Sequence, residues 1–254
     1  MTTELLGIPY SPWSEKARWA LEARKVPYAP VLYQPLLGEP ALRWKLRKFT
    51  GRVSVPVLTD DEGRVHADSA VIARWADARG EGPALFPAEH AAEIDRFVAL
   101  SERGLGAGRG LALRRALADD AALAELVPRG VSKVLGPVAI KIAAAGIRRT
   151  LRKYGTAGAQ RDALEHTLAE VLDELRAALA RSPSTATPKT IFATFTFADI
   201  AMAQVLAFVR PPAFGLKVKP ANRARFEDPA FAEKYADLVA WRDAIYDAHR
   251  PRAK

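Results

Sequence analysis

Residues 5–23 read LLGIPYSPWSEKARWALEA, and this stretch decides how the first third of the chain is interpreted. The apolar run at residues 4–8 is typical of a short buried strand, and residues 13–24 have the apolar spacing of a helix. Ser11 stands between them at the N-cap position, with Pro12 at the first helical position, where the missing N–H of proline is harmless. The stretch therefore predicts a strand that leads directly into a helix N-terminus carrying a hydroxyl group.

The alternation of strand and helix patterns continues for about 80 residues. It predicts strands at 28–33, 55–59 and 64–67, a turn at 60–63, and helices at 41–48 and 68–78. Beyond Pro87 almost every stretch has the pattern of a helix. We therefore expect an α/β domain with the order β-α-β-α-β-β-α at residues 1–80 and an all-α domain at residues 88–254. The linker is marked by Gly80, Gly82, Pro83 and Pro87.

Four helices are expected in the second half, at residues 88–105, 159–180, 200–209 and 229–246. The first of them ends in glycines at positions 104, 106, 108 and 110. These glycines either leave room for a bulky substrate or mark a bend in the helix. Before the third helix, Thr196 and Asp199 have the spacing of a capping box, and we expect them to support folding instead of lining an active site.

Composition excludes several classes of chemistry. The 254 residues carry a net charge of +9, with 49% hydrophobic and 26% charged residues, which is ordinary for a globular protein. The absence of cysteine excludes disulfides, thiolate zinc sites, iron–sulfur clusters and a thiol nucleophile on the enzyme. The four histidines are scattered, so we predict no metal site. No signal peptide and no apolar run of the roughly 18 residues that span a membrane is found, and we expect a cytoplasmic protein.

Most of the net positive charge is accounted for by one segment, residues 126–161, which contains no acidic residue. Its cations are Arg129, Lys133, Lys141, Arg148, Arg149, Arg152, Lys153 and Arg161. The apolar residues among them have amphipathic helical spacing, and such a segment can bind an anionic membrane surface, nucleic acid or an acidic ligand. The alternative is a solvated basic face above an ordinary helical core. No aromatic residue interleaves the cations before Tyr154, which makes nucleic-acid binding unlikely.

Four motifs together make the chain resemble the glutathione S-transferases, in particular the bacterial and plant-like classes that use a serine. They are SPWSEKARWAL at 11–21, SVPVL at 54–58, Asp68-Ser69, and TFADI at 196–200. The resemblance spans most of the chain. It implies the glutathione S-transferase fold, in which a thioredoxin-like α/β domain at the N-terminus is followed by an all-α C-terminal domain.

The resemblance also implies a role for Ser11. A glutathione sulfur beside the Ser11 hydroxyl and the positive end of the helix would be stabilised as a thiolate. Lowering its pKa by about two units from about 8.5 requires only about 2.7 kcal/mol. Two alternatives stay open: Ser11 only caps the helix, or the neighbouring Tyr10 is the hydrogen-bond donor.

Other residues are implied in glutathione binding. The Val55–Pro56 peptide bond would be cis, and the backbone of Val55 would pair with the cysteinyl part of glutathione. Asp68 and Ser69 would present a helix N-terminus to the γ-glutamyl carboxylate, although Asp68 can also be a plain N-cap. Arg52 is a candidate for the glycyl carboxylate, although the lysine motif usual in the family is altered here to Thr-Gly-Arg.

The resulting prediction is a detoxifying glutathione S-transferase that conjugates glutathione, its co-substrate, to a hydrophobic electrophile. The electrophile pocket is expected between the domains, against the helix around residues 99–110, and the protein is expected to be a homodimer. One alternative is a non-catalytic ligand-binding protein with the same fold, associated with a membrane surface through residues 130–153. Another is a nucleic-acid or lipid-surface protein whose binding is driven by charge and depends steeply on salt.

Overall fold

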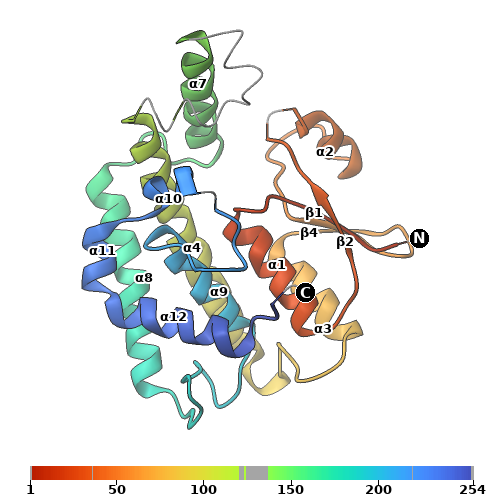
Figure 1. Cartoon of the computed structure of the whole chain (residues 1–254). Coiled ribbons are helices and arrows are strands. Elements are labelled where there is room, and N and C mark those ends of the chain that lie inside the picture. The colour runs from red at the N-terminus through yellow and green to blue at the C-terminus, as the bar shows by residue number, and fades with distance from the viewer. Residues whose placement is uncertain (1, 36, 120–122, 124–136, 219, 253–254) are drawn as a thin grey trace.

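The computed structural model describes residues 2–35, 37–119, 123, 137–218 and 220–252 (Figure 1). A sheet with the strand order β2-β1-β3-β4 occupies the N-terminal part. Its strands are β1 (Glu4–Gly7), β2 (Ala29–Leu32), β3 (Val57–Thr59) and β4 (Val65–Ala67), and its helices are α1 (Pro12–Ala23), α2 (Glu39–Lys45) and α3 (Ser69–Arg79). β1 pairs parallel with β2 and antiparallel with β3, and β3 pairs antiparallel with β4. The predicted order β-α-β-α-β-β-α and the thioredoxin-like fold are confirmed.

Alternating side chains of the sheet are buried on both faces. Leu5 of β1 lies opposite Leu58 of β3, and both pack with residues of α1 and α3 such as Leu21. Leu6 and Val57, the next pair along the strands, belong to a separate cluster with Leu42 of α2 and Tyr33. Because successive strand residues point to opposite faces, a sheet covered by helices on both sides needs such continuous apolar runs.

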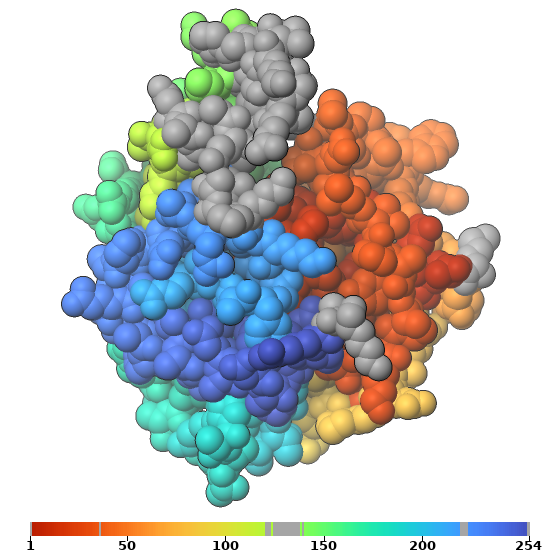
Figure 2. Space-filling view, viewed as in Figure 1, coloured from red at the N-terminus to blue at the C-terminus, as the bar shows by residue number. Residues whose placement is uncertain are grey.

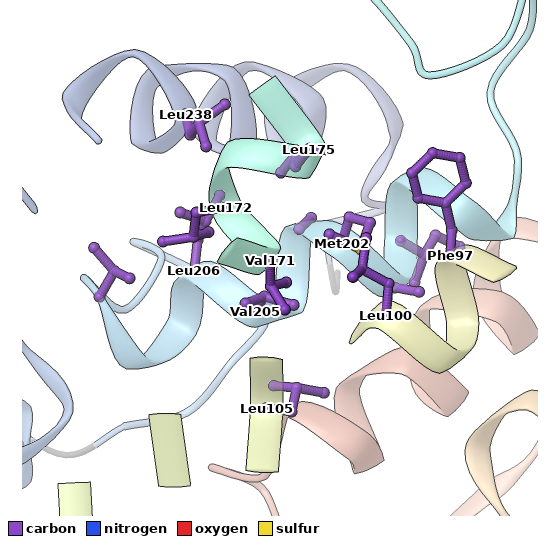
Figure 3. Packing of buried hydrophobic residues seen from close by; sticks show 14 of the residues in the cluster. Phe97, Leu100, Leu105, Val171, Leu172, Leu175, Met202, Val205, Leu206 and Leu238 are labelled. Atoms are coloured by element: carbon purple, nitrogen blue, oxygen red, sulfur yellow. The ribbon is translucent and has the colours of Figure 1, made fainter. Parts of the chain in front are cut away.

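Helices form all the regular structure that is described beyond residue 87. They are η1 (Ala88–His90), α4 (Ala91–Leu117), α7 (Pro137–Lys153), α8 (Arg161–Arg181), α9 (Phe197–Val205), η2 (Leu206–Phe208), α10 (Pro220–Phe226), α11 (Pro229–Lys234) and α12 (Ala236–His249). The largest apolar cluster lies where α4, α8 and α9 meet, and Figure 3 labels Leu105, Val171 and Val205 in it. The predicted all-α second part is therefore confirmed. The exact boundaries 1–80 and 88–254 stay a prediction.

The glycines of α4 explain why its predicted end at residue 105 was wrong. The helix continues to Leu117 because these glycines allow close packing against its neighbours. A Cβ atom on Gly104 would lie 2.7 Å from Val205 of α9, and one on Gly108 would lie 2.7 Å from the side chain of Phe208. Only a residue without a side chain lets two helices approach this closely.

Three other findings concern helix boundaries. α7, which the amphipathic spacing of the basic segment indicated, runs without interruption through Gly146. Residues 126–136 of that segment lie outside the described residues. The helix predicted at 229–246 is two helices separated at Tyr235, whose φ of −116° and ψ of 33° are not helical. The short helix α10 was not predicted. The capping box of Thr196 and Asp199 at the start of α9 is confirmed.

The linker after α3 is fastened to the end of α1 by Arg24. Its guanidinium donates hydrogen bonds to the carbonyl oxygens of Asp77, Gly80, Gly82 and Pro83. A Cβ atom on Gly80 would collide with the backbone of Arg24, so glycine is required for this approach. The chain therefore enters the helical part along a fixed path.

Candidate functional site

Three loops leave the sheet at the same edge and meet there. Val57, the first residue of β3, lies opposite Leu6 of β1 on one side and opposite Ala67 of β4 on the other. The segments that continue beyond these pairs are therefore neighbours. They are residues 8–11 after β1, residues 54–56 before β3, and Asp68–Ser69 after β4. This edge brings together the residues that the sequence analysis selected.

Ser11 is the N-cap of α1 and Pro12 its first residue, as predicted. The Ser11 backbone is extended (φ −90°, ψ 123°), and its Oγ accepts a hydrogen bond from the backbone N–H of Ser14 at 3.4 Å. Among the described residues no acceptor takes the hydroxyl proton of Ser11. The proton is therefore free for a ligand at the positive end of the helix, where unpaired N–H groups favour negative charge.

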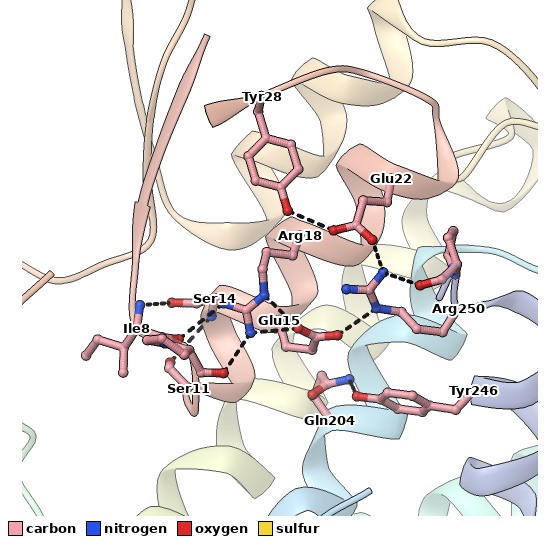
Figure 4. A network of polar contacts seen from close by, with 12 residues as sticks. Ile8, Ser11, Ser14, Glu15, Arg18, Glu22, Tyr28, Gln204, Tyr246 and Arg250 are labelled. Carbon is pink, nitrogen blue, oxygen red and sulfur yellow. Dashed lines mark hydrogen bonds and ion pairs between the residues drawn. The ribbon is translucent and has the colours of Figure 1, made fainter. Parts of the chain in front are cut away.

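The loop that carries Ser11 is held in place by a network of polar contacts (Figure 4). Arg18 donates from Nη2 to the carbonyl oxygen of Pro9 over 3.0 Å and from Nη1 to that of Ile8 over 3.3 Å. The Nε of Arg18 donates to the buried carboxylate of Glu15 over 2.8 Å. These bonds fix the backbone that leads into Ser11.

Ser14 is a second hydroxyl in the same turn, and its contacts are internal. It is fully buried, and its Oγ accepts a hydrogen bond from the backbone N–H of Ile8 at 3.0 Å. A ligand cannot reach this hydroxyl without opening the loop. Ser14 therefore supports the loop and is not a rival to Ser11.

Tyr10, the alternative donor, packs against the second half of the chain. Its ring meets Phe226 edge-on, with 6.5 Å between the ring centroids. Burial raises the pKa of the Tyr10 hydroxyl, and the charge of Arg225 offsets this only in part. A phenol with a raised pKa gives up its proton less readily. Tyr10 thus contacts the helical part of the chain, whereas the Ser11 hydroxyl stands at the N-terminus of α1.

A cavity of about 810 Å³ lies beside residues 54–56, next to β4. Its lining includes Arg52, Ser54 and Asp68. Three further cations that the sequence analysis did not select also line it, and they are Lys45, Arg47 and Lys48. Their signal was present in the sequence, because residues 43–52 contain five cations and no acid. A cavity of this charge suits a small ligand with carboxylates.

Asp68 and Ser69 form the start of α3. Asp68 is exposed and caps the helix, because its Oδ1 accepts a hydrogen bond from the backbone N–H of Ala70 at 2.8 Å. Its φ of 86° lies in the left-handed region, which costs a non-glycine residue roughly 1–3 kcal/mol. Ser69 is only 2% exposed. Strain of this kind is often found at ligand-binding turns.

The second half of the chain closes the site on the side of α1. Trp13 donates from Nε1 to one oxygen of Glu102 in α4 over 2.6 Å, and the buried Nζ of Lys16 lies 2.6 Å from the other. The backbone N–H of Lys217 donates to the carbonyl oxygen of Pro9 over 3.1 Å. In Figure 2 the red and orange N-terminal part lies directly against the blue C-terminal helices.

Aromatic side chains on both sides of Ser11 form a continuous line, which we call the aromatic row. It consists of Tyr10, Phe226, Phe208 and Trp13, with successive centroid separations of 6.5, 5.2 and 6.4 Å. Phe208 and Phe226 are buried behind the other two rings. Tyr10 and Trp13, the end rings of the row, flank Ser11 in the sequence and are the members that a ligand beside Ser11 can contact.

Comparison with known proteins identifies the architecture. Residues 10–79 match the family model of the glutathione S-transferase N-terminal domain. A glutathione transferase family member from Pseudomonas fluorescens Pf-5, solved with bound glutathione, is 20% identical, with a TM-score of 0.59 over 99% of this chain and 100% of that chain. The fold is that of the glutathione S-transferases.

Two further glutathione S-transferases have the same fold. That of Ceriporiopsis subvermispora, in complex with glutathione, is 19% identical with a TM-score of 0.61, over 98% of this chain and 95% of that chain. That of Methylobacillus flagellatus KT, with glutathione bound, is 18% identical with a TM-score of 0.55, over 99% and 100% of the two chains. No curated protein sequence matches this chain.

Within the glutathione S-transferase fold, the peptide bond between Val55 and Pro56 is cis, as the resemblance implied. In the part of the chain that the structure describes, no group of three or more His, Asp or Glu side chains could hold a metal ion. None of the helices described has the length and apolar composition needed to span a bilayer. One further residue at this site, Arg109 of α4, lies over the ring of Trp13 and was not selected from the sequence.

Proposed function

We propose that the protein is a serine-type glutathione S-transferase, in which Ser11 stabilises the glutathione thiolate that attacks a hydrophobic electrophile. The observation that carries this proposal is the position of Ser11. Its hydroxyl caps α1 at the edge where residues 54–56 and Asp68 also leave the sheet. Tyr10 and Trp13, the end rings of the aromatic row, supply apolar contacts for the second substrate.

The reaction needs no covalent bond to the protein. Glutathione releases its thiol proton to solvent, its sulfur forms a bond to the electrophilic carbon, and the leaving group departs with the bonding electron pair. In a conjugate addition the carbanion instead takes up a proton. Ser11 and the dipole of α1 together lower the thiol pKa. The loops that bind glutathione and the end rings of the aromatic row hold the two reactants in contact.

Glutathione would bind as an extended peptide along the sheet edge. β3 begins at Val57, so the backbone groups of Val55 lie outside the strand pairs of the sheet and can pair with the cysteinyl part. Asp68 and Ser69 would hold the γ-glutamyl end, and Arg52 the glycyl carboxylate. The cationic lining of the cavity beside them supports this orientation.

The test is calorimetric titration of glutathione into the wild type and into Ser69→Ala and Arg52→Met, with Thr167→Ala on the exposed face of α8 as the control. We expect about tenfold weaker binding for the first two variants, the effect of one lost hydrogen bond to a charged group, and no change for the control. A conjugation assay with chlorodinitrobenzene is run alongside. Absence of glutathione binding by the wild type would contradict the proposal, and binding without turnover would favour the non-catalytic alternative.

We also propose that the protein acts as a homodimer. Apolar side chains are exposed on its N-terminal part, and they include Leu32, Leu37, Trp44, Phe49 and Val65. Trp44 and Phe49 are 76% and 65% exposed and touch each other edge-on at 6.1 Å. A patch of this kind is typical of an interface. Analytical ultracentrifugation should show a dimer that Trp44→Glu converts to a monomer, and a monomeric wild type would contradict this.

A second candidate function, contact with an anionic membrane surface, is favoured by one feature of α7. This helix projects from the body of the molecule (Figure 1) and contains no acidic residue. Its exposed side carries Val138 and Ile142 beside Lys141, and its other side packs on the end of α4. A basic face with exposed aliphatic residues suits a lipid surface.

Co-sedimentation with vesicles tests this function. We expect binding to phosphatidylserine vesicles that decreases with salt and is weakened in Ile142→Ser, and little binding to phosphatidylcholine vesicles. Equal binding to both kinds of vesicle, or none to either, would contradict it.

A further inference from the structure

Arg109 of α4 is a half-buried arginine that forms no ion pair with a carboxylate of the residues that the structure describes. The carbon of its guanidinium lies 3.5 Å from the ring centroid of Tyr154 and 4.6 Å from that of Trp13. Its Nε is buried and has no hydrogen-bond partner among the described residues. Other arginines with largely buried side chains donate hydrogen bonds to oxygen atoms of the protein, and they include Arg18, Arg24, Arg242 and Arg250. Within the described part of the chain, Arg109 is thus held by two aromatic faces, and its buried Nε lacks an acceptor.

Positive charge around Arg109 exceeds the negative charge available to it. The Cζ atom of Arg52 and the Nζ atom of Lys153 lie 5.5 and 5.9 Å from the centroid of the same Tyr154 ring. The negative charge of the Glu102 carboxylate raises the pKa of Arg109, but this carboxylate is already bound by Lys16 and by Trp13. Burial lowers the pKa of Arg109 to about 10, so the side chain is still a cation at neutral pH. An anion placed here would find a cation that no carboxylate of the described residues pairs with.

The position of Arg109 relates it to the reacting sulfur. Trp13, which it covers, follows Ser11 by two residues in the first turn of α1 and is the last ring of the aromatic row. A molecule that lies next to Ser11 and against Trp13 would therefore contact an apolar ring and, at one end, the guanidinium of Arg109. Arg52 lines the cavity beside residues 54–56, whereas Arg109 does not. Both guanidinium groups lie over the ring of Tyr154, at 5.5 and 3.5 Å from its centroid, so what distinguishes Arg52 from Arg109 is its place in the lining of that cavity.

We propose that Arg109 binds an anionic group of the electrophile, so that the enzyme prefers aromatic electrophiles that carry a carboxylate. The inference rests on the proposed transferase function. With a chlorodinitrobenzoate, the glutathione sulfur forms a bond to the chlorine-bearing carbon and chloride leaves with the bonding electron pair. The carboxylate is unchanged by the reaction and stays on Arg109. Its hydrogen bonds give the buried guanidinium the acceptor that the protein lacks.

The test compares kcat/KM for chlorodinitrobenzoate with that for the uncharged chlorodinitrobenzamide, in the wild type, Arg109→Met and Arg109→Lys. Arg103→Met, on the same helix and paired with Glu170 at the surface, is the control for the loss of one charge. We expect the benzoate-to-benzamide ratio to fall about ten- to a hundredfold in Arg109→Met and less in Arg109→Lys, with the KM for glutathione unchanged. The ratio in Arg103→Met should equal that of the wild type.

Two kinetic outcomes would overturn the inference. An unchanged ratio in Arg109→Met would mean that the guanidinium only packs between the two rings. A raised KM for glutathione with both electrophiles, at an unchanged ratio, would mean that Arg109 binds glutathione instead. Thermal unfolding of each variant shows whether it is folded.

A binding measurement separates this inference from the proposed function. Dinitrobenzoate, which has no leaving group, is titrated into the wild type and Arg109→Met, with dinitrobenzamide as the neutral ligand. If the wild type conjugates neither chloro compound, the transferase proposal fails. Binding of dinitrobenzoate that depends on Arg109 would then still support the anion site, and equal binding by the two proteins would overturn it.

Discussion

Arg250, near the C-terminus, donates a hydrogen bond from Nε to the carboxylate of Glu15 in α1 over 2.7 Å. The two side chains are 5% and 0% exposed, and 235 residues separate them in the sequence. Glu15 also binds Arg18, which holds the carbonyl oxygen of Pro9 in the loop before Ser11. The last residues of the chain thus support the loop that carries the proposed catalytic hydroxyl.

Replacing Arg250 should affect both stability and activity. Arg250→Met leaves the buried carboxylate of Glu15 with one cationic partner fewer, and we expect the free energy of unfolding to fall by about 3 kcal/mol. Conjugation should also decrease at temperatures where the variant is folded. Arg252→Met is the control, because Arg252 forms an exposed ion pair with Asp247, and it should change stability by less than about 1 kcal/mol. Equal stability of the two variants in urea would contradict the support role of Arg250.

The glycines of α4 give a prediction with an internal control. Gly108→Ala would place a Cβ atom 2.7 Å from Phe208, and we expect a loss of about 1–3 kcal/mol from overpacking. A Cβ atom on Gly106 would meet nothing within 4 Å. Gly106→Ala should therefore stabilise the helix by about 0.5–1 kcal/mol. Urea unfolding distinguishes these opposite signs, and two changes of the same sign would contradict the packing seen at α4.

Asp199 should give stability a specific dependence on pH. Burial raises the pKa of this carboxyl to about 6, although hydrogen bonds from Ile191 and Thr196 lower it. A carboxyl with a raised pKa in the folded state stabilises the protein below its unfolded pKa, and this contribution is lost as the pH rises through about 6. The contribution is roughly 3 kcal/mol between the two limits.

The matched variant for this effect is Asp199→Asn, which does not titrate. It loses one acceptor for the buried N–H groups of Ile191 and Thr196, so it should be less stable than the wild type at every pH. The difference between the two proteins should grow as the pH falls from 7 to 4. A difference that stays constant or shrinks over this range would contradict the raised pKa.

Asp68 should show a conflict between stability and binding. Asp68→Gly relieves the φ of 86°, while glycine at an N-cap costs only a few tenths of a kcal/mol, so we expect a net gain of about 1 kcal/mol. Glutathione binding should weaken, because the carboxylate at the start of α3 is lost. Calorimetry and thermal unfolding measure the two effects separately. Tighter binding together with lower stability would contradict both parts.

Local patterns in the sequence were sufficient for the order of elements. The apolar runs around Leu5 and Leu58 predicted strands, and Ser11 followed by Pro12 predicted the start of α1. The separation at Tyr235 and the continuation of α4 beyond Leu105 were missed. Both depend on packing against distant residues, which periodicity does not record.

The candidate site was accessible from the sequence only in part. The residues near the sheet edge belong to short motifs, and Ser11, Val55 and Asp68 could be selected from them. Arg109 could not, because its meaning depends on two rings that come from other helices and loops, Trp13 and Tyr154. A long-range contact of this kind leaves no local signal.

The central claim is that Ser11 stabilises the glutathione thiolate, and the pKa of bound glutathione tests it most directly. Ultraviolet absorbance of the thiolate is followed against pH in the wild type, Ser11→Thr and Ser11→Gly. Ser11→Gly removes the hydroxyl but preserves most of the N-cap stability, so it separates donation from capping. We predict that the thiol pKa of bound glutathione is about two units below its usual value of about 8.5 in the wild type and Ser11→Thr. In Ser11→Gly this pKa should rise most of the way back to about 8.5. A bound thiol that titrates in Ser11→Gly as it does in the wild type would contradict the claim.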